Sequence, residues 1–213
     1  MKPAGIILAG GHSSRMGHDK AFALLGGQTL LAHVVASLEP QVEAILINSS
    51  GEAARFASFG HPVLADYIPG HHGPLAGILT GLLWAKHSLP HVTHLLSAPC
   101  DIPGLPCDIG ARLERALSIS GAKIAIATDE TGLQPTIGLW PVALADQMSA
   151  DLIHRNMRGL QAWLSQFTVA EVPCSDLQNI NTPDDLRLAS LGLAAARRQM
   201  DAPGQHQRVD IDA

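Results

Sequence analysis

A short apolar run over residues 6–9 is followed at once by a glycine-rich loop that carries two cations. Four consecutive apolar residues with no polar alternation are typical of a buried strand. Gly10 and Gly11 lack a Cβ atom, so their backbone can pass close to a ligand and present N–H groups to anionic oxygens. Arg15 and Lys20 then add positive charge. The pattern predicts a strand that opens into a phosphate-binding loop, although an ordinary strand-to-helix turn also uses glycine.

The spacing of this loop excludes two common nucleotide-binding motifs. A Walker A loop needs glycine, four residues and then Gly-Lys-Ser or Gly-Lys-Thr, but Gly17 is followed here by His18 and Asp19. A dinucleotide-binding fingerprint reads Gly-x-Gly-x-x-Gly, whereas this chain has two adjacent glycines and the next one six residues later. The loop is therefore of a different kind.

Apolar runs and helical patterns alternate along the chain, which indicates the α/β class. Short continuous apolar runs indicate strands covered on both faces, as in a mostly parallel sheet. We expect a three-layer, doubly wound, mostly parallel sheet with a Rossmann-like fold. The predicted strands are 5–9, 44–48, 63–66, 92–97, 124–128, 136–140 and 168–172, and the predicted crossover helices are 29–38, 74–87 and 108–117.

The length of 213 residues fits one α/β domain. Thr182 as cap, Pro183 at the first helical position and two acids behind it predict the start of a last helix that ends near Gln199. We expect one domain over residues 1–199. Residues 200–213 include Pro-Gly and have no apolar face, so they are predicted to form a disordered tail.

The charge balance limits the partners of this chain. A formal net charge of −5 and a pI near 6.1 argue against nucleic acid or an anionic membrane surface as a partner. No apolar run reaches the length of a membrane span or has the flanks of a secretory signal, so we expect a cytoplasmic protein. Three cysteines without Cys-x-x-Cys spacing indicate reduced thiols.

A second constellation lies near the middle of the chain, where an apolar run ends in Pro99-Cys100-Asp101-Ile102-Pro103. Ligands of open α/β sheets bind outside the carboxyl ends of the strands, so Asp101 and the Gly10 loop are expected to face one crevice. Mg²⁺ takes one or two protein carboxylates and fills its other positions with water and phosphate oxygens. We therefore predict Asp101 as a magnesium ligand, the alternative being a carboxylate that caps a turn.

The first loop reads Leu-Ala-Gly-Gly-x-Ser-x-Arg-Met-Gly-x-Asp-Lys and resembles the signature of the molybdopterin nucleotidyltransferase family. The pair Gly10-Gly11 is similar to the guanylyltransferase branch, because cytidylyltransferase relatives more often resemble Leu-Ala-Ala-Gly there. The resemblance covers most of the chain from Gly5 to about Leu191. It implies the fold of a nucleotidyltransferase and the activity described below.

The resemblance also implies which residues bind the nucleotide. Asn48 and Asp66 end predicted strands, where a turn role is equally open from the residues alone. The family resemblance makes both of them nucleotide contacts and makes Asp101 the magnesium aspartate. The full set of implied nucleotide-binding residues is Leu8, Ala9, Gly10, Gly11, Lys20, Asn48, Asp66 and Asp101.

Four residues are predicted to bind the acceptor. Gln134 opens a strand after the turn 129–132, in a segment similar to the acceptor-facing half of the family, but it could equally end a hairpin with its amide in solvent. Arg158 precedes a helix start and could grip a phosphate, while a surface helix pair is the alternative. Asn179 and Asn181 alternate around Ile180 and resemble the Asn-x-Asn-Thr-Pro segment that bounds the acceptor pocket, with capping as their other role.

Together these features imply guanylyl transfer from GTP to the terminal phosphate of molybdopterin, with release of pyrophosphate. Arg15, Lys20 and Asp101 are the predicted catalytic residues, Mg²⁺ is the implied cofactor, and proteins of molybdenum-cofactor biosynthesis or target apoenzymes are candidate partners. The alternatives are a molybdopterin cytidylyltransferase and a guanylyltransferase for another phosphorylated acceptor. A carrier that holds the pterin without reaction is a third, and it would release no pyrophosphate.

Overall fold

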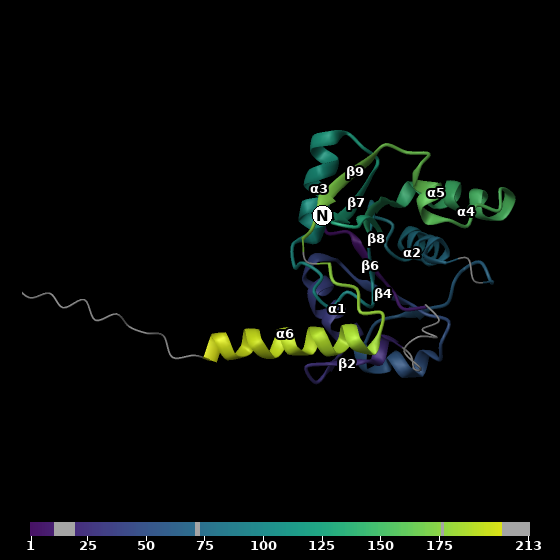
Figure 1. Cartoon of the computed structure of the whole chain (residues 1–213). Coiled ribbons are helices and arrows are strands. Elements are labelled where there is room, and N and C mark those ends of the chain that lie inside the picture. Colours follow the sequence, from purple (N-terminus) through teal and green to yellow (C-terminus); the bar gives the residue numbers. More distant parts are fainter. Residues whose placement is uncertain (11–19, 71–72, 176, 202–213) are drawn as a thin grey trace, which may run out of the picture.

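The computed structural model of this chain describes residues 1–10, 20–70, 73–175 and 177–201. Gly11 and Arg15, and residues 202–213 of the predicted tail, lie outside these ranges. The described residues form a layered α/β structure with α6 along one end (Figure 1).

A seven-stranded sheet has the order β5-β4-β1-β6-β8-β7-β9. The pairings of β1 with β4 and β6, of β4 with β5 and of β7 with β9 are parallel, and only β8 runs antiparallel to its neighbours. The expected mostly parallel sheet is therefore confirmed. The strands are β1 Ala4–Leu8, β4 Ile45–Asn48, β5 Val63–Leu64, β6 His94–Pro99, β7 Ile124–Asp129, β8 Gly132–Pro141 and β9 Val169–Pro173.

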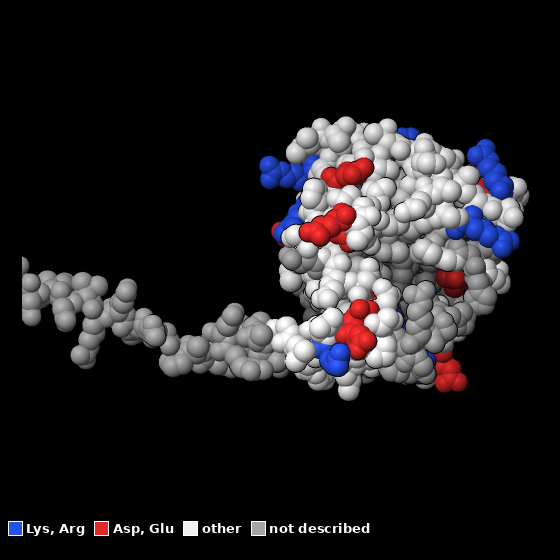
Figure 2. Space-filling view, viewed as in Figure 1, with Lys and Arg blue, Asp and Glu red and all other residues white. Residues whose placement is uncertain are grey.

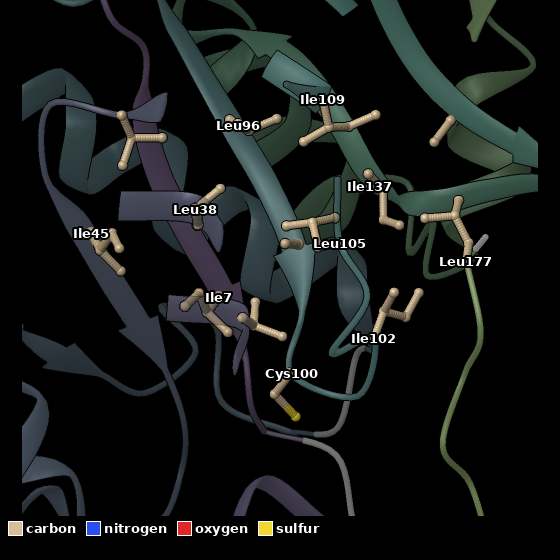
Figure 3. Packing of buried hydrophobic residues seen from close by; sticks show 14 of the residues in the cluster. Ile7, Leu38, Ile45, Leu96, Cys100, Ile102, Leu105, Ile109, Ile137 and Leu177 are labelled. Carbon is tan, nitrogen blue, oxygen red and sulfur yellow. The ribbon is translucent and has the colours of Figure 1, made fainter. Parts of the chain in front are cut away.

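Both faces of the sheet are covered by helices. On one face lie α1 (Leu30–Leu38) and α3 (Ile109–Ser120), and on the other lie α2 (Pro74–Ser88), α4 (Ala145–His154) and α5 (Leu160–Leu164). Successive strand residues alternate between the faces, so Ile6 belongs to one core and Ile7 to the other, both with no exposed surface. Figure 3 shows the core that contains Ile7. The doubly wound, three-layer arrangement is confirmed.

Local sequence explains where several elements begin and end. The Thr29 side chain accepts a hydrogen bond from the Ala32 N–H and caps α1. Pro74 opens α2, and Gly121 ends α3 with a φ of 67°. The predicted helices 29–38, 74–87 and 108–117 therefore lie within one to three residues of the observed ones. None of the three cysteines forms a disulfide bond.

Some elements differ from the expectation. Strand β8 begins at Gly132, four residues before the predicted start at residue 136, because Gly132 has a φ of 115° and allows β7 and β8 to form a tight hairpin. A small hairpin of β2 (Leu24–Leu25) and β3 (Gln28–Thr29) was not predicted. The 3-10 segments were also not predicted: η1 Lys20–Phe22, η2 Glu39–Gln41, η3 Ala53–Phe59 and η4 Val142–Leu144.

The last helix, α6, runs over Pro183–Asp201 and extends away from the body of the molecule (Figure 1). Its first turns pack Leu186 and Leu193 on a small core that includes Leu25 and Ile180. The disordered tail stays a prediction, and the helix includes Met200 and Asp201 beyond its predicted end near Gln199. Both continue the helix, since neither residue breaks it and Pro203 comes only later in the sequence.

The charged side chains are dispersed. On the face shown in Figure 2, Lys and Arg are scattered among Asp and Glu and do not gather into a basic patch. Within the described residues, no helix combines the length and the apolar character that crossing a membrane requires.

Candidate nucleotide and metal site

Asp101 lies where three neighbouring strands end. Leu8 of β1 is in register with Asn48 of β4 on one side and with Pro99 of β6 on the other. The Cys100 N–H continues this pairing by donating to the Leu8 carbonyl oxygen at 3.1 Å. Asp101 follows directly, so its backbone position is fixed by the sheet. The predicted placement at a carboxyl strand end is confirmed.

Lys20 reaches Asp101 from the far end of the glycine-rich loop. Its Nζ donates to Oδ2 of Asp101 at 2.5 Å and to Oδ1 of Asn181 at 2.6 Å. Both side chains are largely buried, with 12% of the Lys20 side chain and 20% of the Asp101 side chain exposed. A charge-assisted hydrogen bond at low exposure is stronger than a surface ion pair. The expectation that the loop and the mid-chain carboxylate share one crevice is confirmed for Lys20.

The second oxygen of Asp101 fits a metal ion. Oδ1 of Asp101 is buried, and within the described part of the chain it is the one buried side-chain oxygen or nitrogen that has no hydrogen-bond partner. A buried carboxylate oxygen without a partner is costly unless a cation or donor satisfies it. Mg²⁺ binds carboxylate oxygens singly and completes its shell with water and phosphate oxygens. Oδ1 is thus suited to a metal while Oδ2 keeps Lys20.

Asn48 and Asp66 form a second part of the same edge. The Asn48 amide nitrogen donates to Oδ1 of Asp66 at 3.0 Å and to the Leu64 carbonyl oxygen at 3.2 Å. Asn48 is 4% exposed, and Asp66 is partly buried. The Ala9 N–H donates to the Asn48 carbonyl oxygen at 2.8 Å, which brings the start of the glycine-rich loop to this pair. The structure therefore groups these predicted nucleotide residues.

Gly77 lets α2 approach this pair closely. A Cβ atom at position 77 would lie 2.5 Å from Oδ1 of Asn48 and 2.7 Å from Cδ2 of Leu8. Both distances are too short for van der Waals contact, so the first turn of α2 needs glycine here. The helix N-terminus, with its partial positive charge, consequently lies beside Asn48.

The segment that contains Asn179 and Asn181 runs beside Asp101. The Ile180 N–H donates to the Asp101 carbonyl oxygen at 2.9 Å, and Ile180 has no exposed surface. The predicted alternation of two asparagines around a buried isoleucine is confirmed. Asn181 lies at the Lys20 amine, whereas the acceptor roles of Asn179 and Asn181 stay predictions.

Asp185 fixes this segment, and the sequence did not single it out for that task. Its Oδ2 accepts from the N–H groups of Asn181 at 2.9 Å and Thr182 at 2.8 Å, and its own N–H donates to the Thr182 hydroxyl at 3.2 Å. This reciprocal arrangement is a capping box. The hydrogen bond from the Asn181 backbone is the largest cause that lowers the pKa of Asp185 below its usual value. The spacing Thr-x-x-Asp was the signal available in the sequence.

Gln134 lies in the β7–β8 hairpin. Its amide nitrogen donates to Oδ2 of Asp129 at 2.7 Å and to the Thr131 hydroxyl at 3.1 Å. An open hollow of about 410 Å³ lies between this hairpin and the segment before Asn179, lined by Asp129, Glu130, Thr131, Ser175, Leu177 and Gln178. Gln134 therefore lies in a hairpin, but its amide nitrogen is held by hydrogen bonds instead of being left to solvent, and its acceptor role stays a prediction.

Arg158 is on the connection between α4 and α5. Its Nε donates to Oδ1 of Asn156 at 2.8 Å. Helices α4 and α5 lie beside α2, well away from α6 in Figure 1. The structure therefore does not group Arg158 with Asn181, and its phosphate-binding role stays a prediction. Asp151, buried nearby, accepts from the Trp163 ring nitrogen at 3.0 Å and stabilises this helix pair.

Comparison with known proteins agrees with this geometry. Residues 5–170 match the family model of the MobA-like NTP transferase domain. A molybdenum cofactor guanylyltransferase of Bradyrhizobium sp. (strain ORS 278) is 39% identical over 197 residues, which cover 88% of this chain and 93% of that protein. Another, from Rhodopseudomonas palustris (strain HaA2), is 40% identical over 198 residues, 90% of this chain and 92% of that protein.

A solved structure shares the fold. The molybdopterin-guanine dinucleotide biosynthesis protein A of Archaeoglobus fulgidus superposes with a TM-score of 0.70 at 21% identity, over 90% of this chain and 99% of that chain. At this identity the likeness concerns the fold. The match of the family model over most of the chain, and relatives of this identity and coverage, confirm the resemblance inferred from the first loop. The chain belongs to the MobA-like NTP transferase family.

Proposed function

We propose that this protein is a molybdenum cofactor guanylyltransferase, which transfers GMP from GTP to the terminal phosphate of molybdopterin and releases pyrophosphate. The observation that supports it best is the contact of Lys20 with Asp101, which joins the loop and the carboxylate of the family signature at one sheet edge. We take GTP as the nucleotide and molybdopterin as the acceptor from the names of the relatives, which are molybdenum cofactor guanylyltransferases.

The reaction needs no protein general base. An oxygen of the acceptor phosphate attacks the α-phosphorus of GTP, a P–O bond forms, and the bond between the α-phosphorus and its bridging oxygen to the β-phosphate breaks. The electron pair of that bond leaves with pyrophosphate. A phosphate monoester has a second pKa of about 6, so at neutral pH the attacking oxygen is largely deprotonated already. Catalysis is then electrostatic and positional.

Lys20 supplies positive charge where negative charge develops on the leaving pyrophosphate. Its two hydrogen bonds, to Asp101 and Asn181, hold the ammonium group in place before the nucleotide arrives. Preorganised charge of this kind does not have to reorient during the reaction. Gly11 and Arg15 are proposed to help bind the triphosphate, as their positions in the signature imply.

Asp101 is the proposed magnesium ligand through its buried, unpartnered Oδ1. When bound, Mg²⁺ would neutralise phosphate charge and act as a Lewis acid on a phosphoryl oxygen. Asn48 and Asp66 are proposed to bind the nucleoside, and Leu8, Ala9 and Gly10 to contribute backbone contacts. Gln134, Arg158, Asn179 and Asn181 remain the proposed acceptor-binding residues.

The test is incubation of the purified protein with molybdopterin, Mg²⁺ and each nucleoside triphosphate separately. The product is identified by mass, and pyrophosphate is measured in parallel. We expect a guanine dinucleotide and one pyrophosphate for each product formed. A product that contains only cytidine would overturn the choice of guanine, and tight pterin binding without pyrophosphate would indicate a carrier.

A further inference from the structure

A cluster outside the predicted site residues includes Phe22, which follows Lys20 by two positions in the chain. It consists of Phe22 from η1 and of Arg55 and Phe56 from η3, and we call it the aromatic clamp. The ring centroids of Phe22 and Phe56 are 5.2 Å apart with a tilt of 49°. The Arg55 guanidinium carbon lies 4.5 Å from the Phe22 ring centroid. Phe22 therefore contacts a phenyl ring and a cation, both supplied by η3.

Burial shows which member anchors the cluster. Phe56 has no exposed surface and belongs to the core that also contains Ile7 and Ile47. Phe22 is partly buried against that core, and Arg55 is exposed. Aromatic pairs at this separation add about 0.5–1.5 kcal/mol beyond area burial, and a cation over a ring at an exposed site adds about 0.5–1 kcal/mol. The clamp thus connects the three-residue turn η1 to Phe56, which is fully buried in the core.

The clamp bears on Lys20 because η1 is only three residues long, Lys20–Phe22. Within this turn the Ala23 N–H donates to the Lys20 carbonyl oxygen at 3.1 Å, and short 3-10 turns depend on tertiary packing for their position. The packing of Ala21, which has no exposed surface, and of Phe22 therefore sets where the Lys20 backbone lies. At the other end of the side chain, Asp101 and Asn181 set where its Nζ lies.

The clamp also joins the two parts of the site. Segment η3 begins five residues after Asn48, the residue that pairs with Asp66. Segment η1 carries Lys20, which pairs with Asp101. Contact of Phe22 with Phe56 thus sets the position of the cation relative to the strand that ends in Asn48.

We propose that Phe22, Arg55 and Phe56 are positioning residues for Lys20, so that the exposed Arg55 strengthens binding of the nucleotide's β- and γ-phosphates without touching them. This inference rests on the proposed nucleotide site. Arg55 lies outside the motifs of the family resemblance stated above, and its action on the triphosphate goes through Phe22 and Lys20.

The experiment is titration calorimetry of the full-length protein with GTP or CTP in the presence of Mg²⁺ and without acceptor, with GMP as the ligand that lacks both outer phosphates. We expect Arg55→Ala to raise the Kd for GTP about two- to fivefold, and Phe22→Leu, which loses both the aromatic pair and the cation contact, to raise it about fivefold or more, as the contact energies above imply. The Kd for GMP should change less than about twofold. Phe22→Tyr, which keeps the ring, should bind GTP like the wild type.

A double-mutant cycle separates positioning from general destabilisation. If Arg55 acts through Lys20, then Arg55→Ala should change the Kd for GTP less than about twofold in a Lys20→Ala background. Arg115→Ala, which removes an exposed arginine from α3, is the matched control and should leave all affinities unchanged. Thermal unfolding of each variant confirms that it is folded.

The proposal is overturned if Arg55→Ala and Phe22→Leu bind GTP with the wild-type Kd, or if they raise the Kd for GTP and for GMP equally. It is also overturned if Arg55→Ala raises the Kd for GTP by the same factor in the Lys20→Ala background as in the wild type. A wild type that binds CTP but not GTP overturns the guanylyl assignment alone, and the clamp is then judged on CTP by the same criteria. A wild type that binds neither nucleotide overturns both.

Discussion

Nζ of Lys20 lies 2.5 Å from Oδ2 of Asp101, although 81 positions separate the two residues in the chain. The contact brings Lys20, at the start of η1, to the residue that follows β6 by two positions. It leaves Oδ1 of Asp101 buried and without a hydrogen-bond partner among the described residues. One carboxylate can therefore hold a lysine with one oxygen and leave the other oxygen for the proposed magnesium ion, and both cations would neutralise phosphate charge.

Removal of either partner should impair transfer. We expect Lys20→Ala and Asp101→Ala each to reduce transition-state stabilisation by about 2–4 kcal/mol, because each removes a preorganised charge. The measurement is kcat/KM for GTP with molybdopterin as acceptor. Lys86→Ala is the matched control, since Lys86 pairs with Asp146 on the surface at 2.8 Å. Near-normal turnover by a folded variant would refute the role of that residue.

Addition of one methyl group at Gly77 should displace Asn48, which is proposed to bind the nucleoside. A Cβ atom there would push on Oδ1 of Asn48, at 2.5 Å, and on Leu8, at 2.7 Å. We expect Gly77→Ala to lower the free energy of unfolding by about 1–3 kcal/mol and to weaken binding of GTP and GMP alike. Calorimetry and denaturant unfolding measure both.

Gly192→Ala is the control for that substitution, because Gly192 lies in α6 with nothing within 4 Å of its built Cβ atom. It should leave nucleotide binding unchanged. Unaltered GTP affinity in Gly77→Ala would show that the position of Asn48 does not matter for the nucleotide.

Replacement of Asn181 and replacement of Asn179 should change different kinetic parameters. Asn181 accepts a hydrogen bond from Lys20 at 2.6 Å, so its replacement by alanine loosens the catalytic cation. We expect Asn181→Ala to lower kcat/KM for GTP at least about tenfold, since hydrogen bonds to charged groups contribute about 1.5–3 kcal/mol. Asn179→Ala should raise KM for molybdopterin and leave GTP binding intact. Identical profiles for the two variants would contradict this division of roles.

The cap formed by Asp185 should make stability depend on pH in the acid range. Hydrogen bonds from the Asn181 backbone and from Thr182 lower the pKa of this carboxyl from its ordinary value of 3.8, so the folded state binds fewer protons than the unfolded state. The stabilisation is therefore fully present above the ordinary pKa and is lost as pH falls through the lower folded-state pKa.

We accordingly expect Asp185→Ala to melt at a lower temperature than the wild type at pH 6, with a difference that shrinks once the pH falls below about 4. Thermal unfolding monitored by circular dichroism across this range measures it. Asp184→Ala is the matched control, because Asp184 is exposed and pairs only with its helix neighbour Arg187 among the contacts described. A difference that does not change with pH would mean that the Asp185 charge is unimportant.

Local sequence determined the elements of this fold well where side-chain chemistry acts within a few residues. The run that ends in Ala9 indicated a strand covered on both faces, and Thr29, Pro74 and Gly121 mark helix ends where the structure has them. The short hairpin of β2 and β3 could not be predicted from local sequence. Its strands have two residues each, so they show no periodicity, and they are held by packing against α6.

The sequence also determined which residue types are available for phosphate and metal, since Gly10, Lys20 and Asp101 stand in a spacing with few other uses. It did not determine which atoms meet. The pairing of Lys20 with Asn181 and the stacking of Arg55 on Phe22 join residues that are 161 and 33 positions apart, and the burial of one Asp101 oxygen also depends on the assembled fold. Contacts at such separations depend on strand order and helix packing, because loop closure allows many partners and only the assembled sheet selects among them.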